Sequence, residues 1–289
     1  MEPERIGEDV ELYLGDCRAV LPLLAAGSAK CCVTSPPYWG GLRDYGHPGQ
    51  IGLERNPSDY VDVLSAVFVD IRRVLADDGT LWLNVGDVYA ASGKGGGGSA
   101  GTRGSWDTVR DRKGFRMPPE GYKQKDLTLV PMLLADRLRR DGWYLRQTVI
   151  WSKPSATEPK RLDRPSVSHE YLFLFAASEQ YAARDPGEDW WGQSVWTIQP
   201  EADPGHPAVM PAELVRRCVL SSSSEGDAVI DPFAGSGMVG RVCSRWGRRF
   251  IGIEISDEHY ATARRRLTHA TGAGEGQLFG CLGEETSRD

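Results

Sequence analysis

The chain contains 289 residues, and its 34 Lys and Arg against 40 Asp and Glu give a formal net charge of −6 at pH 7. That balance excludes a protein that coats nucleic acid through bulk positive charge, and no apolar run approaches the roughly 20 residues that a membrane-spanning helix requires. The N-terminus lacks the apolar core of a secretory signal, and the six cysteines show neither C-x-x-C spacing nor a nearby histidine that would complete a zinc pattern. We therefore expect a cytoplasmic protein with reduced cysteines, no metal site and no membrane contact.

Hydrophobic patterns typical of strands and helices alternate along the chain. In order, they predict a strand over 10–14, a helix over 16–24, a strand over 30–34, a helix over 57–75, a strand over 80–85 after an Asp78-Gly79 turn, a helix over 129–140, and strands over 147–151 and 169–176. The later part predicts a helix over 211–220, a strand over 228–230, a helix over 238–246, a strand over 249–253 and a helix over 257–267. The clearest helix is 57–75, because Asn56 suits its N-cap and Pro57 suits its first turn. This alternation predicts an α/β fold with a doubly wound, mostly parallel sheet.

Charge is unevenly distributed along the chain. Residues 94–170 contain 16 basic and 9 acidic residues, a net of +7, whereas the remainder carries −13. We call residues 94–170 the basic block. Just before and within it, residues 92–101 are rich in glycine, which predicts a flexible loop that continues as a long basic loop to residue 125.

A glycine-rich turn follows the strand predicted at 228–230. It reads Asp231-Pro232-Phe233-Ala234-Gly235-Ser236-Gly237 and precedes a predicted helix, whose first amides favour a polar ligand. Glu254 follows the next predicted strand, and a carboxylate there suits the hydroxyls of a ribose. Gly235, Gly237 and Gly240 also fit the G-x-G-x-x-G pattern of an NAD site, but only 35 residues follow Glu254, which favours a single nucleoside. A tight turn without a ligand is the remaining alternative.

A second polar turn, Ser35-Pro36-Pro37-Tyr38-Trp39, follows the strand predicted at 30–34. The prolines fix the backbone and lack N–H groups, so carbonyls and the Ser35 hydroxyl remain as acceptors. Tyr38 and Trp39 add flat aromatic faces. This combination suits a planar group that carries an NH₂, which would donate to Ser35 and to the Pro36 carbonyl while the ring stacks on Tyr38. An ordinary Pro-Pro turn with exposed aromatics is the alternative.

Together the two motifs resemble those of beta-class S-adenosylmethionine-dependent DNA amino-methyltransferases, in which an SPPY-type motif precedes the cofactor motif. Segments 13–16, 79–84, 150–154 and 206–211 also match, so the resemblance covers most of residues 11–267; Met238 departs from the usual Thr. The resemblance implies a Rossmann-like methyltransferase fold with S-adenosylmethionine as cofactor, and residues 209–210 at its methionine end. The implied cofactor-binding residues are Asp16, Asp231, Phe233, Ala234, Gly235, Ser236, Gly237 and Glu254, and the implied catalytic residues are Ser35, Pro36, Pro37 and Tyr38.

The resemblance also implies methyl transfer to the exocyclic amine of a base that is flipped out of double-stranded DNA and stacked on Tyr38. Ser35 favours cytosine N4, because adenine-N6 enzymes more often carry Asp or Asn at that position; adenine N6 is the alternative. A tyrosine at position 38, where a cysteine nucleophile would be needed, disfavours methylation at cytosine C5. An NAD-linked oxidoreductase and a non-catalytic nucleic-acid-binding module are the alternatives from other classes.

We expect a single catalytic domain over residues 1–271, with a glycine-rich basic loop at 87–126, a partly irregular target-recognition region at 153–206, and a C-terminal tail at 272–289. The basic block supplies the expected phosphate contacts. The expected DNA-binding residues are Lys94, Arg103, Arg110, Arg112, Lys113, Arg116, Lys123, Lys125, Lys153 and Arg161. A cognate restriction endonuclease and a second copy of the chain are further candidate partners.

Overall fold

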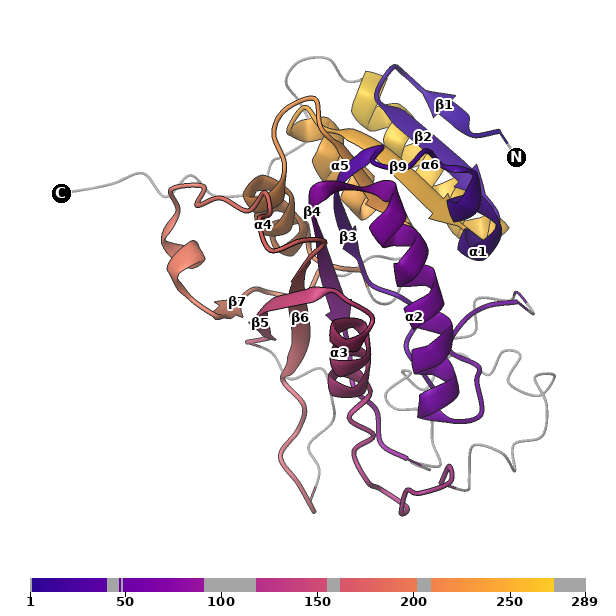
Figure 1. Cartoon of the computed structure of the whole chain (residues 1–289), viewed down its shortest axis with the longest axis vertical. Coiled ribbons are helices and arrows are strands. Elements are labelled where there is room, and N and C mark those ends of the chain that lie inside the picture. Colours follow the sequence, from indigo (N-terminus) through magenta and orange to yellow (C-terminus); the bar gives the residue numbers. More distant parts are fainter. Residues whose placement is uncertain are drawn as a thin grey trace.

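The computed structural model describes residues 2–40, 47, 49–90, 118–154, 162–201 and 209–272. These residues form one nine-stranded sheet in the order β1-β2-β9-β8-β3-β4-β6-β5-β7 (Figure 1). The strands are β1 (Glu4–Ile6), β2 (Val10–Leu14), β3 (Ala29–Thr34), β4 (Leu75–Val85), β5 (Tyr144–Ser152), β6 (His169–Ala176), β7 (Val195–Thr197), β8 (Ala228–Asp231) and β9 (Arg249–Glu254). The helices are α1 (Cys17–Val20), α2 (Pro57–Val74), α3 (Val130–Arg140), α4 (Ala212–Ser222), α5 (Met238–Arg245) and α6 (Asp257–Gly272), with short 3₁₀ helices η1 (Leu21–Leu23) and η2 (Asp189–Gly192).

Most neighbouring strands run parallel, as predicted. β2, β9, β8, β3 and β4 form a continuous parallel series, and β5 pairs with β7 in the same way. β6 is antiparallel to both β4 and β5, and β1 is antiparallel to β2. The predicted doubly wound α/β fold is confirmed, while the reversed direction of β6 and the short strands β1 and β7 were not predicted.

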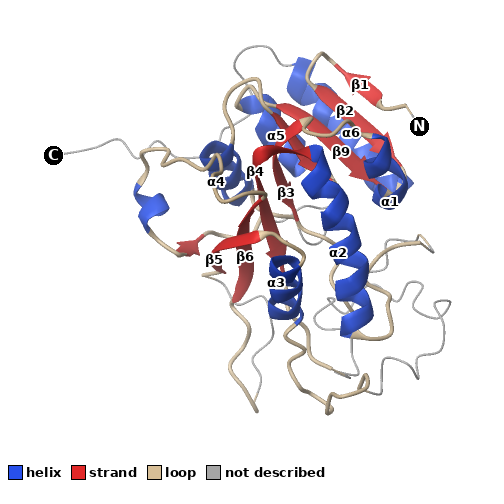
Figure 2. Ribbon diagram, viewed as in Figure 1, coloured by secondary structure: helices blue, strands red, loops and turns tan. Residues whose placement is uncertain are grey.

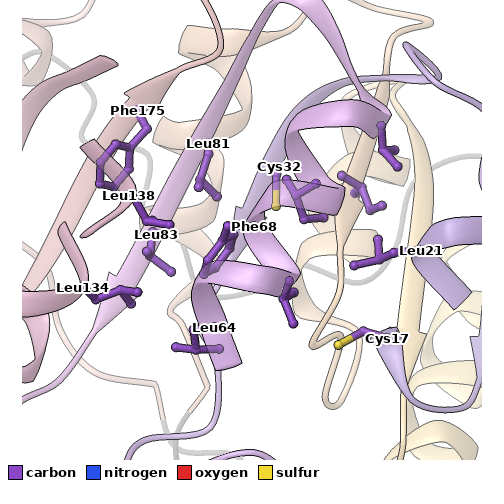
Figure 3. Packing of buried hydrophobic residues seen from close by; sticks show 14 of the residues in the cluster. Cys17, Leu21, Cys32, Leu64, Phe68, Leu81, Leu83, Leu134, Leu138 and Phe175 are labelled. Atoms are coloured by element: carbon purple, nitrogen blue, oxygen red, sulfur yellow. The ribbon is translucent and has the colours of Figure 1, made fainter. Parts of the chain in front are cut away.

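Helices cover both faces of the sheet (Figure 2). α1, α2 and α3 pack on one face, and α4, α5 and α6 on the other. The alternation of side chains in β4 shows why both layers are needed: Leu81 and Leu83 point toward Phe68 and Leu138 on the first face, as Figure 3 shows, whereas Trp82 packs in the opposite layer. Burial of each such leucine stabilises the fold by roughly 1.5–3 kcal/mol.

Several element boundaries differ from the prediction. β4 begins at Leu75, directly after α2, and its pairing with β3 shifts between Leu75 and Thr80, so the expected Asp78-Gly79 turn is an irregularity inside the strand. Asn56 occupies the N-cap position of α2 without capping it, because its side-chain amide donates to the carboxylate of Asp59 instead. The helix expected over 16–24 divides into α1 and η1.

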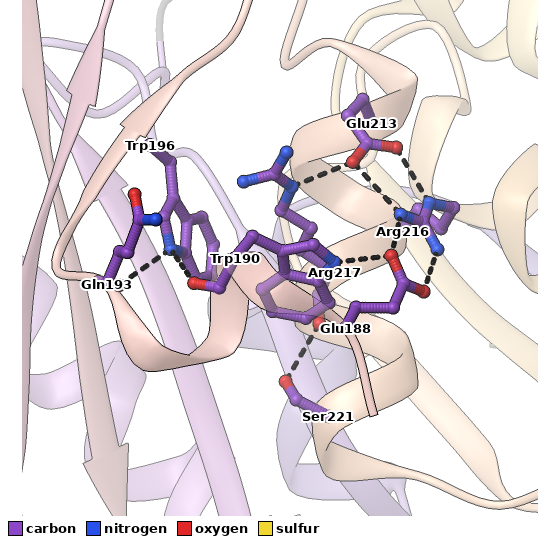
Figure 4. Close-up of polar contacts among 8 residues, drawn as sticks. All are labelled: Glu188, Trp190, Gln193, Trp196, Glu213, Arg216, Arg217 and Ser221. Carbon is purple, nitrogen blue, oxygen red and sulfur yellow. Dashed lines mark hydrogen bonds and ion pairs between the residues drawn. The ribbon is translucent and has the colours of Figure 1, made fainter. Parts of the chain in front are cut away.

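Part of the region 153–206, which was expected to be partly irregular, is joined to α4 by ion pairs and ring contacts. Glu188, just before η2, accepts hydrogen bonds from Arg216 at 2.7 and 2.8 Å, and Arg217 lies over the rings of Trp190 and Trp196 (Figure 4). The Arg216 guanidinium lowers the pKa of Glu188 to about 2. These contacts fix the connection between β6 and α4 against the second helical layer.

The described cysteines are free thiols buried in the core: Cys17, Cys31, Cys32, Cys218 and Cys243. Burial raises the pKa of the Cys31 thiol to about 12, so it packs as a neutral group. In the described ranges, no group of three or more His, Cys, Asp or Glu side chains is placed to hold a metal ion. Of the helices in those same ranges, none has the length and apolar character that a membrane crossing requires.

Candidate active site

The strand order of the sheet reverses between the neighbouring strands β3 and β8. β4 lies on one side of β3 and β9 on the far side of β8, so the carboxyl ends of β3 and β8 border the crevice in which such sheets bind ligands. Thr34, the last residue of β3, donates its hydroxyl to Oδ1 of Asp231, the last residue of β8, at 2.6 Å. This bond joins the starting points of the two sequence motifs.

Asp231 is nearly inaccessible, at 2% exposure. Burial raises the pKa of its carboxyl to about 7, because the charged form is poorly solvated there. The Thr34 hydroxyl and the Phe233 amide, which donates to the same oxygen at 3.0 Å, partly oppose that shift. Asp231 therefore orders the start of the glycine-rich turn from within the protein.

A cleft of about 750 Å³, partly open to solvent, lies beside these strand ends. Asp16 and Glu254 line it together with residues of both motifs: Ser35, Pro36, Pro37, Tyr38, Phe233 and Gly235. A neighbouring hollow of about 350 Å³ shares Ser35, Phe233 and Gly235 with the cleft, and Val209, Met210, Asp231, Ala234 and Ser236 contribute to its walls. Two motifs that lie about 200 residues apart in sequence thus line adjoining hollows.

The Ser35–Tyr38 turn is held from behind. The hydroxyl of Tyr60 in α2 donates to the Pro37 carbonyl at 2.7 Å, so that acceptor is used within the protein. Gly52, with φ of 101°, packs so close that a Cβ there would lie 2.7 Å from the Tyr38 carbonyl oxygen. Among the described residues, the Ser35 hydroxyl and the Pro36 carbonyl have no hydrogen-bond partner. Two acceptors therefore remain on the wall of the cleft.

Glu254 ends β9 and is 7% exposed. Its Oε2 accepts from the Gly235 amide at 2.7 Å and its Oε1 from the Ser256 amide at 2.8 Å. Burial raises the pKa of this carboxyl, and the two amides act against that shift. Because a carboxylate offers about four acceptor positions, Glu254 can both hold the turn and bind hydroxyls in the cleft.

Gly237 lies in the same turn but serves the fold. It is the N-cap of α5, with φ of 82°, and a Cβ there would lie 3.1 Å from the Cβ of Ala263 in α6. The positive φ and the close approach of α6 both favour glycine at this position.

Asp16 lines the cleft as expected, but its carboxylate is already engaged. It is the N-cap of α1, where it accepts from the Arg18 amide at 2.9 Å and from the Arg18 guanidinium at 2.5 Å. Burial would raise the pKa of Asp16, but the hydrogen bonds from Arg18 outweigh it and lower the pKa. Arg18 also donates to the carbonyl of Gly49 at 2.7 Å, so this pair fastens one rim of the cleft.

The structure adds lining residues that sequence reasoning missed. Gly49, Gln50 and Ile51 line the cleft from the connection between β3 and α2, and no motif or periodicity marked them. His259, in the first turn of α6, also lines the cleft, and its Nδ1 lies 4.0 Å from Glu254. Its spacing, five residues after Glu254 in sequence, is the feature that could have indicated His259 as a lining residue.

Most of the expected DNA-binding residues lie outside the described residues: Lys94, Arg103, Arg110, Arg112, Lys113, Arg116 and Arg161. Lys123 is exposed, and Lys125 is exposed and paired with Asp163 at 3.2 Å. Lys153 differs from the expected exposed contact, because its side chain is only 9% exposed and its ammonium is paired with Glu170. The arrangement around Lys153 faces Tyr38 rather than open solvent.

The family model for DNA methylases matches residues 29–265, which is most of the chain. The chain belongs to the DNA methylase family. It is 43% identical over 274 residues to the Type II methyltransferase M.SmaI of Serratia marcescens, an alignment that covers 89% of this chain and 90% of that relative. It is also 43% identical over 281 residues to the DNA adenine methyltransferase YhdJ of Escherichia coli K12, which covers 93% of this chain and 87% of that relative.

A solved relative extends the likeness to three dimensions. A protein of Thermus thermophilus named as a DNA modification methylase, in complex with S-adenosyl-L-methionine, aligns with a TM-score of 0.63 and 26% identity over 91% of this chain and 96% of its own. This DNA methylase is therefore an S-adenosylmethionine-dependent amino-methyltransferase of the N4/N6 family with the predicted Rossmann-like methyltransferase fold.

The residues of the site fit that cofactor. The walls of the main cleft combine apolar Phe233 and Ile253 with the Glu254 carboxylate, the mixture of apolar surface and few polar groups that small-molecule sites use. When the cofactor is bound, the Glu254 carboxylate would offer acceptors to ribose hydroxyls, and the hollow beside Met210 and Ser236 would take the methionine end. Membership of the DNA methylase family replaces the NAD-linked alternative.

Proposed function

We propose that this methyltransferase modifies the N4 amine of cytosine in double-stranded DNA. The observation that carries the proposal is the pair of acceptors on one wall of the cleft, the Ser35 hydroxyl and the Pro36 carbonyl, beside the cofactor motif. Serine at the first position of this motif favours cytosine N4 over adenine N6. We further propose that Ser35 and Pro36 accept from the base amine, that Tyr38 stacks on the base and that Glu254 binds the cofactor ribose.

The amine of a nucleobase is a weak nucleophile, because its lone pair is delocalised into the ring. If the two N–H groups of the amine donate hydrogen bonds, one to the Ser35 hydroxyl oxygen and one to the Pro36 carbonyl, the nitrogen is favoured in a pyramidal geometry. Its lone pair is then free to react. Bound S-adenosylmethionine supplies an electrophilic methyl group on its sulfonium. The nitrogen forms a bond to that methyl carbon while the carbon–sulfur bond breaks, and the sulfur keeps the electron pair and leaves as a neutral thioether. The nitrogen then releases one proton to solvent, and the protein contributes mainly by holding the amine in line.

Access to the cleft requires a base outside the duplex. A stacked cytosine cannot reach acceptors at the carboxyl end of β3, so the target base must flip out. Tyr38 lines the cleft next to Pro36 and Pro37, and its ring is proposed to replace the lost stacking. Exposed cations of the basic block are proposed to hold the duplex through its phosphates.

Adenine N6 is the second candidate target. One relative at 43% identity is named a DNA adenine methyltransferase, and an adenine amine would use the same two acceptors. Nucleoside mass spectrometry of methylated DNA separates the two targets. N4-methylcytosine as the product supports the proposal, and N6-methyladenine as the only product would overturn it.

We also propose a restriction endonuclease of the same target sequence as a partner, because M.SmaI is named a Type II methyltransferase. A homodimer is a further proposal. Resistance of DNA from expressing cells to such a nuclease tests the first, and analytical ultracentrifugation tests the second.

A further inference from the structure

The hydroxyl of Tyr38 is tied to a largely buried ion pair. It donates to Oε2 of Glu170 at 2.6 Å, and a longer contact of 3.4 Å reaches Oδ1 of Asn84. The other oxygen of Glu170 accepts from Lys153 Nζ at 2.5 Å. The side chains of Lys153 and Glu170 are only 9% and 16% exposed, and Lys153 lies over the ring of Trp151, 4.3 Å from its centroid.

The pairing of β4, β5 and β6 brings Asn84, Lys153 and Glu170 to the same end of these strands. Lys153 directly follows β5, and Glu170 is the second residue of β6, paired with Trp151. Asn84 lies near the carboxyl end of β4, where it pairs with Leu172. The ion pair thus stands next to the carboxyl edge from which the Ser35–Tyr38 turn departs. Neither Glu170 nor Lys153 lines the cleft, so both act from behind Tyr38.

The ring of Tyr38 is also seated on the backbone. A Cβ at Gly86, the residue after β4, would lie 2.6 Å from Cε2 of Tyr38 and 3.1 Å from its Cδ2 and Cζ. One edge of the ring therefore rests on Gly86 and the far end is fastened to Glu170. Tyr38 also lines the cleft.

We propose that Glu170 and Lys153 are positioning residues that hold the Tyr38 ring where it stacks on the flipped base, and that Lys153 does so instead of binding DNA phosphate. The inference rests on the proposed function, because it assigns the stacking role to Tyr38. A carboxylate accepts a shorter and stronger hydrogen bond from a phenol than a neutral group does, so Glu170 resists rotation of the ring. Lys153 supplies the charge partner that a largely buried carboxylate needs.

The variants Tyr38→Phe, Glu170→Ala and their double variant test this coupling by single-turnover methyl transfer. We expect Glu170→Ala to lower the rate about 10- to 100-fold, since small misplacement at a reacting centre has effects of that size. The double variant should be no slower than the slower single variant, because both changes remove one hydrogen bond. Affinity for S-adenosylmethionine, measured by calorimetry, should stay unchanged.

A second readout follows the base itself. With 2-aminopurine at the target position, the wild-type protein should quench the flipped base by stacking on Tyr38, and Glu170→Ala should quench it less. Glu170→Gln with Lys153→Met removes both charges but keeps an acceptor for the Tyr38 hydroxyl, so it should restore most of the rate. Asp78→Asn is the control, because it removes the charge from the Lys30–Asp78 ion pair near the amino ends of β3 and β4, away from the strand ends that border the cleft.

The outcomes separate the two proposals. A wild-type rate in Glu170→Ala, multiplied losses in the double variant, or an equal loss in Asp78→Asn would overturn the positioning role alone. Full methyl transfer by Tyr38→Ala would overturn the stacking role in the proposed function, and the positioning role with it. Non-additive losses with retained cofactor affinity support both.

Discussion

Substitution of Gly86 by alanine tests how closely the site depends on the seat of Tyr38. The added Cβ would stand 2.6 Å from Cε2 of the ring, whereas carbon atoms in contact prefer about 3.5–4.0 Å. The ring must therefore move by about 1 Å, against the bond from its hydroxyl to Glu170. Such a displacement lowers a rate by about 100-fold, and overpacking of this kind reduces the free energy of unfolding by about 1–3 kcal/mol.

The assay compares Gly86→Ala with Gly226→Ala. Gly226 lies at the amino end of β8, with φ of 83° and no atom within 4 Å of a Cβ, so alanine there costs about 1–2 kcal/mol through backbone strain without touching Tyr38. Urea unfolding should show similar losses of stability in both variants, and single-turnover methyl transfer should be slow only in Gly86→Ala. Equal methyl-transfer rates in the two variants would show that contact between Gly86 and the Tyr38 ring does not control the reaction.

Three further predictions concern the cofactor, the pH dependence and the DNA. Glu254→Ala should weaken S-adenosylmethionine binding by about 10-fold or more in calorimetry, because ribose hydroxyls lose a charged acceptor; unchanged affinity would contradict its role. Burial raises the pKa of Asp231 to about 7 in the folded protein. Between about pH 4 and pH 7 the folded state therefore keeps a proton that the unfolded state has lost. The free energy of unfolding should consequently fall by up to about 4 kcal/mol as the pH rises from about 4 to about 7. Asp231→Asn should flatten this contribution in chemical denaturation followed across pH, and an identical pH slope would count against it. Neutralisation of several exposed lysines and arginines of the basic block should weaken DNA binding and reduce its salt dependence without a change in cofactor affinity, as fluorescence anisotropy at several salt concentrations would show; undiminished binding would remove the block from the DNA interface.

Parallel-strand logic explains why the centre of the site could be predicted. Ser35 and Asp231 each follow an apolar strand, and the carboxyl ends of β3 and β8 meet at one edge whatever the length of chain between them. The glycines and Glu254 likewise keep fixed offsets from β8 and β9. Local pattern and the topology of the α/β sheet were sufficient for these residues.

Other parts of the site depend on pairings that the sequence does not encode locally. In the sequence alone, Lys153 cannot be distinguished from an exposed cation. Its ion pair with Glu170 depends on the antiparallel pairing of β5 with β6. Gly49 lines the cleft, and its carbonyl accepts a hydrogen bond from Arg18, 31 residues earlier. Such contacts join segments without periodicity, so composition and spacing carry no signal for them.

The Ser35–Tyr38 turn and the glycine-rich turn are proposed to form one active site for methyl transfer to a base amine. The most direct measurement follows a labelled methyl group from S-adenosylmethionine to duplex DNA, with cofactor binding measured in parallel, for the wild type and Ser35→Ala. With the wild type, we expect label on an exocyclic amine, and Ser35→Ala should show a large loss of transfer with retained cofactor binding. Undiminished transfer by Ser35→Ala would contradict the proposed active site.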